Sequence, residues 1–123
     1  HLSTIVENPD ELKVIMGRSR IGFCPDTAHL FAGGGDPAEL IRTYPDRVRH
    51  VHLKDFQPEP FNFMPLGKGV LDFGDIIRAI AESGYSSWLM VELDSYDGDP
   101  KDAARISKDY LEHLLAEAGI GRD

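Results

Sequence analysis

The sequence has few of the features that mark secreted, membrane-bound or nucleic-acid-binding proteins. Cys24 is the only cysteine among 123 residues, so no internal disulfide can form, and we expect a reducing, cytoplasmic location. No apolar run approaches the roughly 18 to 20 residues needed to cross a bilayer. With 13 Lys and Arg against 21 Asp and Glu, the formal net charge is −8, and no basic stripe is present to bind phosphates. We therefore expect neither a membrane nor a nucleic acid as a partner.

The beginning of the chain carries no export signal. The opening stretch HLSTIVENPD lacks Met and also lacks the charged, apolar and small-residue regions of a signal peptide.

The length suits a single domain over 1–123, and a content of 41% hydrophobic and 28% charged residues is typical of a globular protein.

Alternating helix and strand patterns run along the whole chain. An Asn or Asp cap followed by Pro begins ENPDEL, GDPAELI and GDPKDAARI, and Asp72 caps a fourth helix without proline. These starts predict helices over about 9–17, 37–44, 73–83 and 100–118. Apolar runs predict strands over 20–26, 47–55 and 87–94, and LSTIV reads as the end of an earlier strand. The alternation predicts an α/β fold with parallel strands.

Polar side chains lie near the C-terminal end of each predicted strand. The two-residue alternation of strands places Asp26, then His52 with Lys54, then Glu92 on the face opposite the apolar residues. Active sites of parallel α/β folds lie at this edge, so these side chains are expected to converge. Asp, His and Glu together suit Mn²⁺, Co²⁺, Mg²⁺ or Zn²⁺. A strand-end carboxylate is also a common helix cap or ion-pair partner, so the pattern alone leaves both interpretations open.

Several motifs in this order resemble one enzyme family. They are DTAHL, GGGDP, HVHLKD and VELD, and they lie within a likeness that runs from about residue 1 to 115. The chain resembles the xylose isomerase-like TIM barrel superfamily of sugar isomerases and epimerases, and within it the inosose dehydratase branch. This resemblance implies the C-terminal half of a (β/α)8 barrel, with a divalent metal ion, Mn²⁺ or Co²⁺ first, at its C-terminal mouth.

The resemblance also implies roles for single residues. Asp26, His52 and Glu92 match three metal ligands of the family. The fourth ligand should lie at or just before the start of the chain, where His1 and Glu7 are the nearby candidates. Matches to substrate-binding or catalytic groups are His29 and Lys54. The LGKG loop, which lacks the spacing of a phosphate-binding loop, is expected to lie over the substrate, with Lys68 as a further substrate contact.

Three other side chains have plainer interpretations. Cys24 is predicted to be a small buried packing residue rather than a thiolate nucleophile. His50 is predicted to be a hydrogen-bonded interior residue, and His113 to face outward from the last helix.

The expected chemistry is that of a metal-dependent lyase or isomerase acting on a small sugar or inositol ketone. The metal polarises the carbonyl, Glu92 removes a proton from the adjacent carbon, and an enediolate forms. Loss of a β-hydroxyl, assisted by His29 or Lys54, gives the inosose (keto-inositol) dehydratase-like reaction. Reprotonation instead gives a ketose 3-epimerase or a hydroxypyruvate-type isomerase.

Two alternatives of another class remain, together with one structural requirement. A non-catalytic half-barrel binding module and an apurinic-site endonuclease-like protein are the alternatives, and the acidic charge disfavours the second. Half a barrel exposes sheet edges and an apolar inner face. We therefore expect either a missing N-terminal half or a second copy, as in a homo-oligomer, to complete the barrel.

Overall fold

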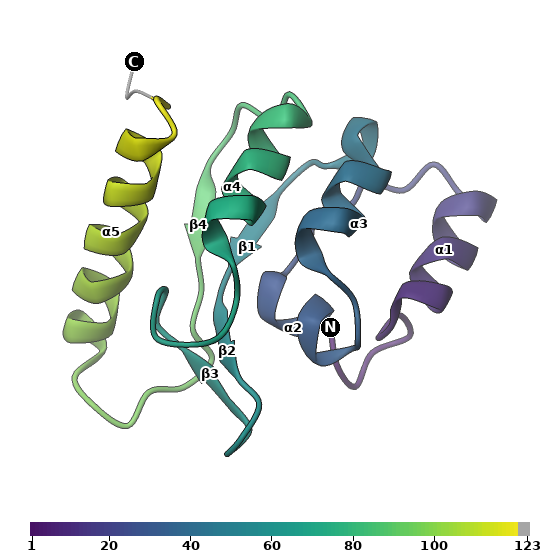
Figure 1. Cartoon of the computed structure of the whole chain (residues 1–123). Coiled ribbons are helices and arrows are strands. Elements are labelled where there is room, and N and C mark those ends of the chain that lie inside the picture. Colours follow the sequence, from purple (N-terminus) through teal and green to yellow (C-terminus); the bar gives the residue numbers. More distant parts are fainter. Residues whose placement is uncertain (121–123) are drawn as a thin grey trace.

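The computed structural model describes residues 1–120 and consists of helices packed on one side of short strands (Figure 1). The predicted domain, 1–123, therefore extends three residues beyond the described part. The elements in chain order are α1 (Pro9–Arg18), α2 (Thr27–Ala32), α3 (Pro37–Thr43), the 3-10 helix η1 (Pro45–Arg47), β1 (Val51–Leu53), β2 (Asp55–Gln57), β3 (Asn62–Met64), α4 (Phe73–Glu82), β4 (Leu89–Val91) and α5 (Pro100–Glu117).

All four predicted helices are confirmed, and so are their caps. The side chains of Asn8, Asp36, Asp72 and Asp99 accept hydrogen bonds from backbone N–H groups in the first turns of α1, α3, α4 and α5, respectively. Each cap satisfies a donor that the helix itself leaves without a partner. The predicted boundaries are met within one residue.

The parallel arrangement of the strands is also confirmed. β1 pairs with β4 in parallel, with His52 opposite Met90, and the backbone N–H of Glu92 donates to the carbonyl of Leu53 over 3.0 Å. His52 and Glu92 consequently lie at the same edge of the sheet.

The predicted strand over 20–26 is wrong as a regular strand. Within the described residues, this stretch pairs with the segment 48–52 of the same chain through isolated parallel bridges, Phe23 with Val48 and Asp26 with His52. Pro25 lacks a backbone N–H and so cannot continue the ladder, although its carbonyl accepts from the N–H of His52 over 2.9 Å. The predicted strand end LSTIV is wrong as well, because this stretch consists of turns.

Residues 55–64 form a hairpin that the sequence reasoning missed. No strand was predicted between residues 55 and 87, but β2 and β3 pair antiparallel there, with Phe56 opposite Phe63. The predicted strand 47–55 also divides at Lys54, since β1 and β2 pair with different strands. The hairpin continues the chain from the C-terminal end of β1 (Figure 1).

The core lies between the strands and the helices. Val51 and Leu53 of β1 are fully buried, and α4 contributes Phe73, Ile76 and Ile77 on one apolar face. Burying each such side chain stabilises the fold by about 1.5–3 kcal/mol. The opposite face of the strands is open.

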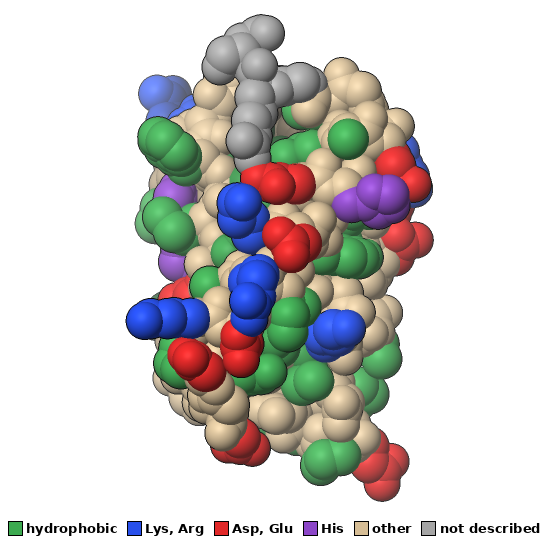
Figure 2. Space-filling view, turned by 90° about the vertical axis from the view of Figure 1, so that its left-hand side faces the viewer, with side chains coloured by type: hydrophobic (Ala, Val, Ile, Leu, Met, Phe, Trp, Pro, Cys, Tyr) green, Lys and Arg blue, Asp and Glu red, His purple; other side chains and the backbone are tan. Residues whose placement is uncertain are grey.

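Charged side chains of both signs lie over the outer face of α5 (Figure 2). One of the ion pairs there joins Lys108 to Glu112 over 3.5 Å. His113 is exposed, as predicted, and pairs with Glu117 over 3.3 Å. Within residues 1–120, no helix is both long and apolar enough to cross a membrane.

Candidate metal centre

The strand edges bring Asp26, His52 and Glu92 together. The Nδ1 of His52 lies 2.8 Å from Oε2 of Glu92 and 3.8 Å from Oδ2 of Asp26. These three residues come from segments far apart in sequence, and the parallel register aligns their strand ends. Their proximity is a finding of the structure, whereas their role as metal ligands stays a prediction.

Asp26 has two different oxygens. Its Oδ1 accepts from the backbone N–H of His29 over 3.2 Å and so caps α2, the short helix that the sequence reasoning missed. Its Oδ2 is buried and makes no hydrogen bond within residues 1–120. Burial raises the pKa of Asp26, against the opposing influence of the His29 N–H and of Lys54. A buried carboxylate oxygen without a hydrogen bond is costly, and the nearest groups to this one are Nζ of Lys54 and Nε2 of His1, each 3.3 Å away.

His1 lies on the other side of the same oxygen. Its Nε2 is 3.3 Å from Oδ2 of Asp26, and one ligand atom each from His1, Asp26 and His52 lie within 4.8 Å of one another. Two imidazoles and a carboxylate, with a second carboxylate at Glu92, form a donor set that suits Zn²⁺, Mn²⁺ or Co²⁺. The residues present therefore fit a divalent cation. Glu7, the other candidate for the fourth ligand, is exposed and does not belong to this group of His1, Asp26 and His52.

Lys54 is fully buried beside these carboxylates. Its Nζ lies 2.6 Å from Oδ2 of Asp94 and 3.3 Å from both Oδ2 of Asp26 and Oε2 of Glu92. It also lies 4.8 Å from the ring centre of Phe63, on the hairpin. Burial alone would lower the pKa of Lys54, but these carboxylates outweigh it and raise the pKa above its ordinary value. Lys54 is therefore a fixed positive charge within the cluster.

Glu92 is held in its ionised form by its neighbours. Burial alone would raise its pKa, but Asp26 and the positive charge of Lys54, with His52, outweigh it and lower the pKa. The pKa values of the two carboxyls that face Lys54 over 3.3 Å are thus shifted in opposite directions, that of Asp26 upward and that of Glu92 downward.

His29 has a defined orientation and tautomer. Its Nδ1 accepts from the backbone N–H of Leu2 over 3.3 Å, which leaves the proton on Nε2. That Nε2 lies 4.0 Å from Oδ2 of Asp94. The ring is stacked on that of His1, with centroids 4.1 Å apart, and contacts the tilted ring of Phe63, with centroids 4.8 Å apart. Burial lowers the pKa of His29, so the imidazole is neutral near pH 7 and presents an N–H to the cluster.

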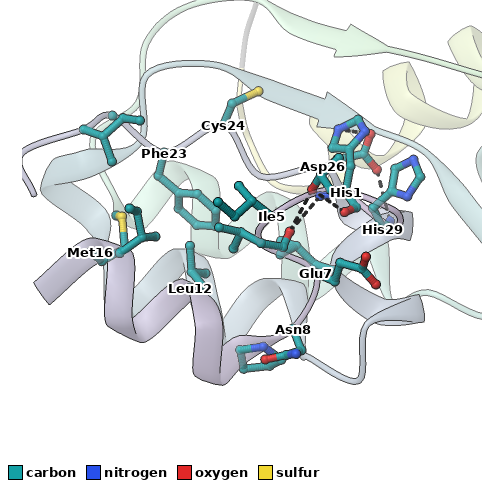
Figure 3. Close-up of a pocket in the computed structure, with 17 residues that line it drawn as sticks. His1, Ile5, Glu7, Asn8, Leu12, Met16, Phe23, Cys24, Asp26 and His29 are labelled. Atoms are coloured by element: carbon teal, nitrogen blue, oxygen red, sulfur yellow. Dashed lines mark hydrogen bonds and ion pairs between the residues drawn. The ribbon is translucent and has the colours of Figure 1, made fainter. Parts of the chain in front are cut away.

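An apolar cavity of about 310 Å³ adjoins this cluster. His1, Asp26 and His29 gather at one end of it, and Phe23, Leu12 and Met16 line the other (Figure 3). The polar groups thus lie at the border of a region of low polarity, which strengthens the electrostatic interactions among them.

Two of the plainer predictions are wrong. Cys24 was expected to be buried, but it is exposed at the cavity, because no second strand of the described chain pairs with 20–26 on that side. His50 was expected to be a hydrogen-bonded interior residue. It is half-buried, and its ring packs edge-on against that of His52 with centroids 5.1 Å apart.

Lys68 does not join the cluster. It is exposed, and the backbone N–H groups of Gly67 and Gly69 on either side of it donate to Asp55. Two residues that the sequence reasoning missed, Asp94 and Phe63, do contact the predicted set. Asp94 could have been found from its two-residue spacing after Glu92, whereas Phe63 depends on a hairpin that no pattern indicated.

Comparisons with known proteins agree with this architecture. The sequence model of the xylose isomerase-like TIM barrel family matches residues 3–114. The chain is 29% identical over 137 residues to an inosose dehydratase of Geobacillus kaustophilus, covering 94% of this chain and 44% of that protein. It is 31% identical over 141 residues to the rhizopine catabolism protein MocC of Rhizobium meliloti, covering 98% and 43%. The chain thus spans less than half the length of these curated relatives.

Solved structures show the same fold. An IolI protein described with a bound zinc atom superposes with a TM-score of 0.71 at 18% identity, covering 91% of this chain and 45% of that one. A xylose isomerase domain protein from Planctomyces limnophilus superposes with a TM-score of 0.65 at 24% identity, covering 96% and 44%. Both matches extend over most of this chain and under half of the other.

Proposed function

The chain belongs to the xylose isomerase-like TIM barrel family, and on that premise we propose that the whole protein is a metal-dependent lyase or isomerase of polyol ketones. An inosose dehydratase-like reaction is the first choice, since inosose dehydratases are among its relatives. The observation that carries the proposal is the buried Oδ2 of Asp26, which has no hydrogen bond within residues 1–120 and lies among His1, His52 and Glu92.

The proposed cation ligands are Asp26, His52 and Glu92, with His1 as the fourth group at hand. A divalent cation held there, with Mn²⁺ or Co²⁺ first, would polarise the carbonyl of a chelating ketone and make a proton on the adjacent carbon acidic. This chain's own residues would supply the proton transfers.

Glu92 is the proposed base. Its lowered pKa keeps it ionised near neutral pH, so it is ready to accept the proton from the carbon next to the carbonyl. Electrons from the broken C–H bond then move toward the carbonyl oxygen, giving an enediolate. The positive charge of Lys54, 3.3 Å from Glu92, favours the negative charge that builds up in this step.

His29 is the proposed donor to a substrate oxygen. Its Nε2–H faces the cluster, and the backbone bond to Nδ1 holds the ring in place. In a dehydration, the β C–O bond breaks and the departing hydroxyl leaves as water with a proton from the Lys54 ammonium, which regains it from the protonated Glu92, 3.3 Å away. His29, being neutral, serves as a hydrogen-bond donor to the departing oxygen, because a neutral imidazole does not give up its remaining proton. Reprotonation of the enediolate without loss of hydroxyl would instead give an epimerase or isomerase.

The proposal is tested with the full-length protein. Keto-inositols and ketoses are offered as substrates after chelation and re-addition of Mn²⁺ or Co²⁺, and turnover is followed. We expect His52→Ala and Glu92→Gln to lose at least about 100-fold in kcat/KM, since the first removes a proposed cation ligand and the second removes the proposed base.

His113→Ala and Glu117→Gln are the matched controls. These residues form an exposed pair at the end of α5, 3.3 Å apart and away from the cluster, so turnover should stay as in the unaltered protein. Activity that persists in both His52→Ala and Glu92→Gln would show the proposed mechanism to be wrong.

A further inference from the structure

Asp94 contacts the two groups of the cluster that are not proposed ligands. It follows β4 by three residues, and its Oδ2 lies 2.6 Å from Nζ of Lys54 and 4.0 Å from Nε2 of His29. The Lys54 contact is the shortest of the three that this ammonium makes with carboxylates. Asp94 itself is 45% exposed, so it can adopt this position without a large desolvation cost of its own.

Lys54 poses an electrostatic problem for a metal site. It is fully buried, and apart from Asp94 its carboxylate partners are Oδ2 of Asp26 and Oε2 of Glu92. These are the oxygens proposed to hold the cation. An ammonium and a divalent cation drawn to the same oxygens repel each other strongly where water is excluded.

The charges of the cluster balance only when Asp94 is counted. The carboxylates of Asp26, Glu92 and Asp94 face one ammonium, that of Lys54, and leave two negative charges over. With the imidazoles neutral, one divalent cation neutralises that remainder. Without Asp94, a loaded site would carry one excess positive charge beside a buried lysine.

We propose that Asp94 is a positioning residue that serves as the counter-ion of Lys54, so that Asp26 and Glu92 remain free to bind the cation. The proposal rests on the metal site proposed above and extends it to a residue outside the ligand set. Asp94 holds Lys54 by a short charge-assisted hydrogen bond, and the ring of Phe63, 4.8 Å from Nζ, supports the ammonium on another side.

Mn²⁺ affinity, measured by isothermal titration calorimetry on the full-length protein, tests this directly. Asp94→Asn keeps the size of the side chain and removes its charge. We expect it to weaken Mn²⁺ binding roughly 10- to 100-fold, the usual effect of losing a partner just outside the ligands. Asp97→Asn, three residues farther along the same loop and exposed, removes the same charge away from the cluster and should change the affinity less than about threefold.

Two further variants separate charge balance from local structure. Asp94→Glu retains the charge and should bind Mn²⁺ more tightly than Asp94→Asn. Lys54→Met in the Asp94→Asn background removes the unbalanced ammonium and should recover most of the lost affinity, which a double-mutant cycle measures as coupling. Thermal unfolding without metal checks that each variant is folded.

The outcomes distinguish the two proposals. Wild-type affinity in Asp94→Asn, or no recovery on adding Lys54→Met, would overturn the counter-ion role while leaving the metal site in place. Unchanged Mn²⁺ binding in Asp26→Ala would overturn the metal site itself, and with it both proposals.

Discussion

Lys54 and Asp55 are neighbours of opposite charge, both fully buried, and each finds its partners on a different side of the chain. Lys54 points to the carboxylates of the proposed metal site. Asp55 accepts four backbone N–H bonds, from Phe56, Gly67, Gly69 and Leu71, over 2.8–3.2 Å. Adjacent side chains of an extended chain point to opposite faces. Lys54, which has a proposed chemical role, is thereby separated from Asp55, which holds the 66–71 loop in place.

Asp55→Asn should destabilise the protein by at least about 2 kcal/mol. The amide can accept at only one position, and its NH₂ would face backbone donors that then lack a partner. The midpoint of thermal unfolding of the full-length protein measures the loss, which should amount to several degrees. Asp46→Asn, at an exposed position in η1, is the control and should change the midpoint by less than a degree. An equal effect of the two substitutions would contradict this account of the loop.

At the scale of elements, α3 and α4 are joined by one arginine. Arg42 of α3 donates two hydrogen bonds to Asp75, over 2.8 and 2.9 Å, and one to Glu82 over 2.7 Å. The bidentate pair with Arg42 lowers the pKa of Asp75 to about 2. This contact links the outer rims of two helices whose inner faces pack on β1.

The Arg42–Asp75 pair should contribute a pH-dependent part of the stability. The folded-state pKa of Asp75 lies below its ordinary value of 3.8, so the contribution is present above pH 4 and is lost as the pH falls from about 4 toward 2. Both side chains are about one-third exposed, so solvent screening keeps this contribution small.

Thermal unfolding of wild type and Asp75→Asn from pH 6 to pH 2.5 measures this contribution. We expect the wild type to be the more stable at pH 6, with the difference shrinking as the pH falls from about 4 to 2.5. Asp102→Asn, which breaks an exposed pair with Arg105 inside α5, is the control and should show little dependence on pH. A difference between wild type and Asp75→Asn that stays constant over this range would contradict the assignment to Asp75.

At the scale of the whole molecule, one face of the chain is left open. Trp88 is 80% exposed and Met90 47% exposed on the uncovered face of the β4 segment, and Ile5 is 95% exposed near the cavity. Large exposed apolar side chains such as Trp88 and Met90, two residues apart on one face of a strand segment, mark a surface that contacts something else. The chain also spans under half the length of its relatives, which supports the expectation that further chain covers this face.

The isolated 123-residue chain should therefore self-associate, whereas the full-length protein should do so far less. Sedimentation velocity over a range of concentrations measures this. Trp88→Gln should shift the isolated chain toward monomer, because it removes the largest exposed apolar group on the open face. Val14→Gln, at a 54% exposed position on α1, is the control and should leave the distribution unchanged. A chain that stays monomeric throughout would contradict this prediction.

The sequence by itself determined the four predicted helices, the parallel arrangement and the face on which the site lies. Caps such as Asn8 and Asp72 act within three residues of themselves, and strand alternation assigns His52 and Lys54 to one face without reference to distant parts of the chain. The convergence of Asp26, His52 and Glu92 followed from the same logic, because parallel strands end at one edge.

Only the tertiary structure decided which of these groups contact each other. Several of these contacts join residues from separate segments. They include the ion pair of Lys54 with Asp94, the stacking of His29 on His1, and the contact of His29 with Phe63 on the hairpin. Distances of this kind depend on how the backbone bends after each strand, which no local pattern encodes. The stretch 20–26 is a further example. A regular strand needs hydrogen bonds to a neighbouring strand, and Pro25 has no backbone N–H to donate.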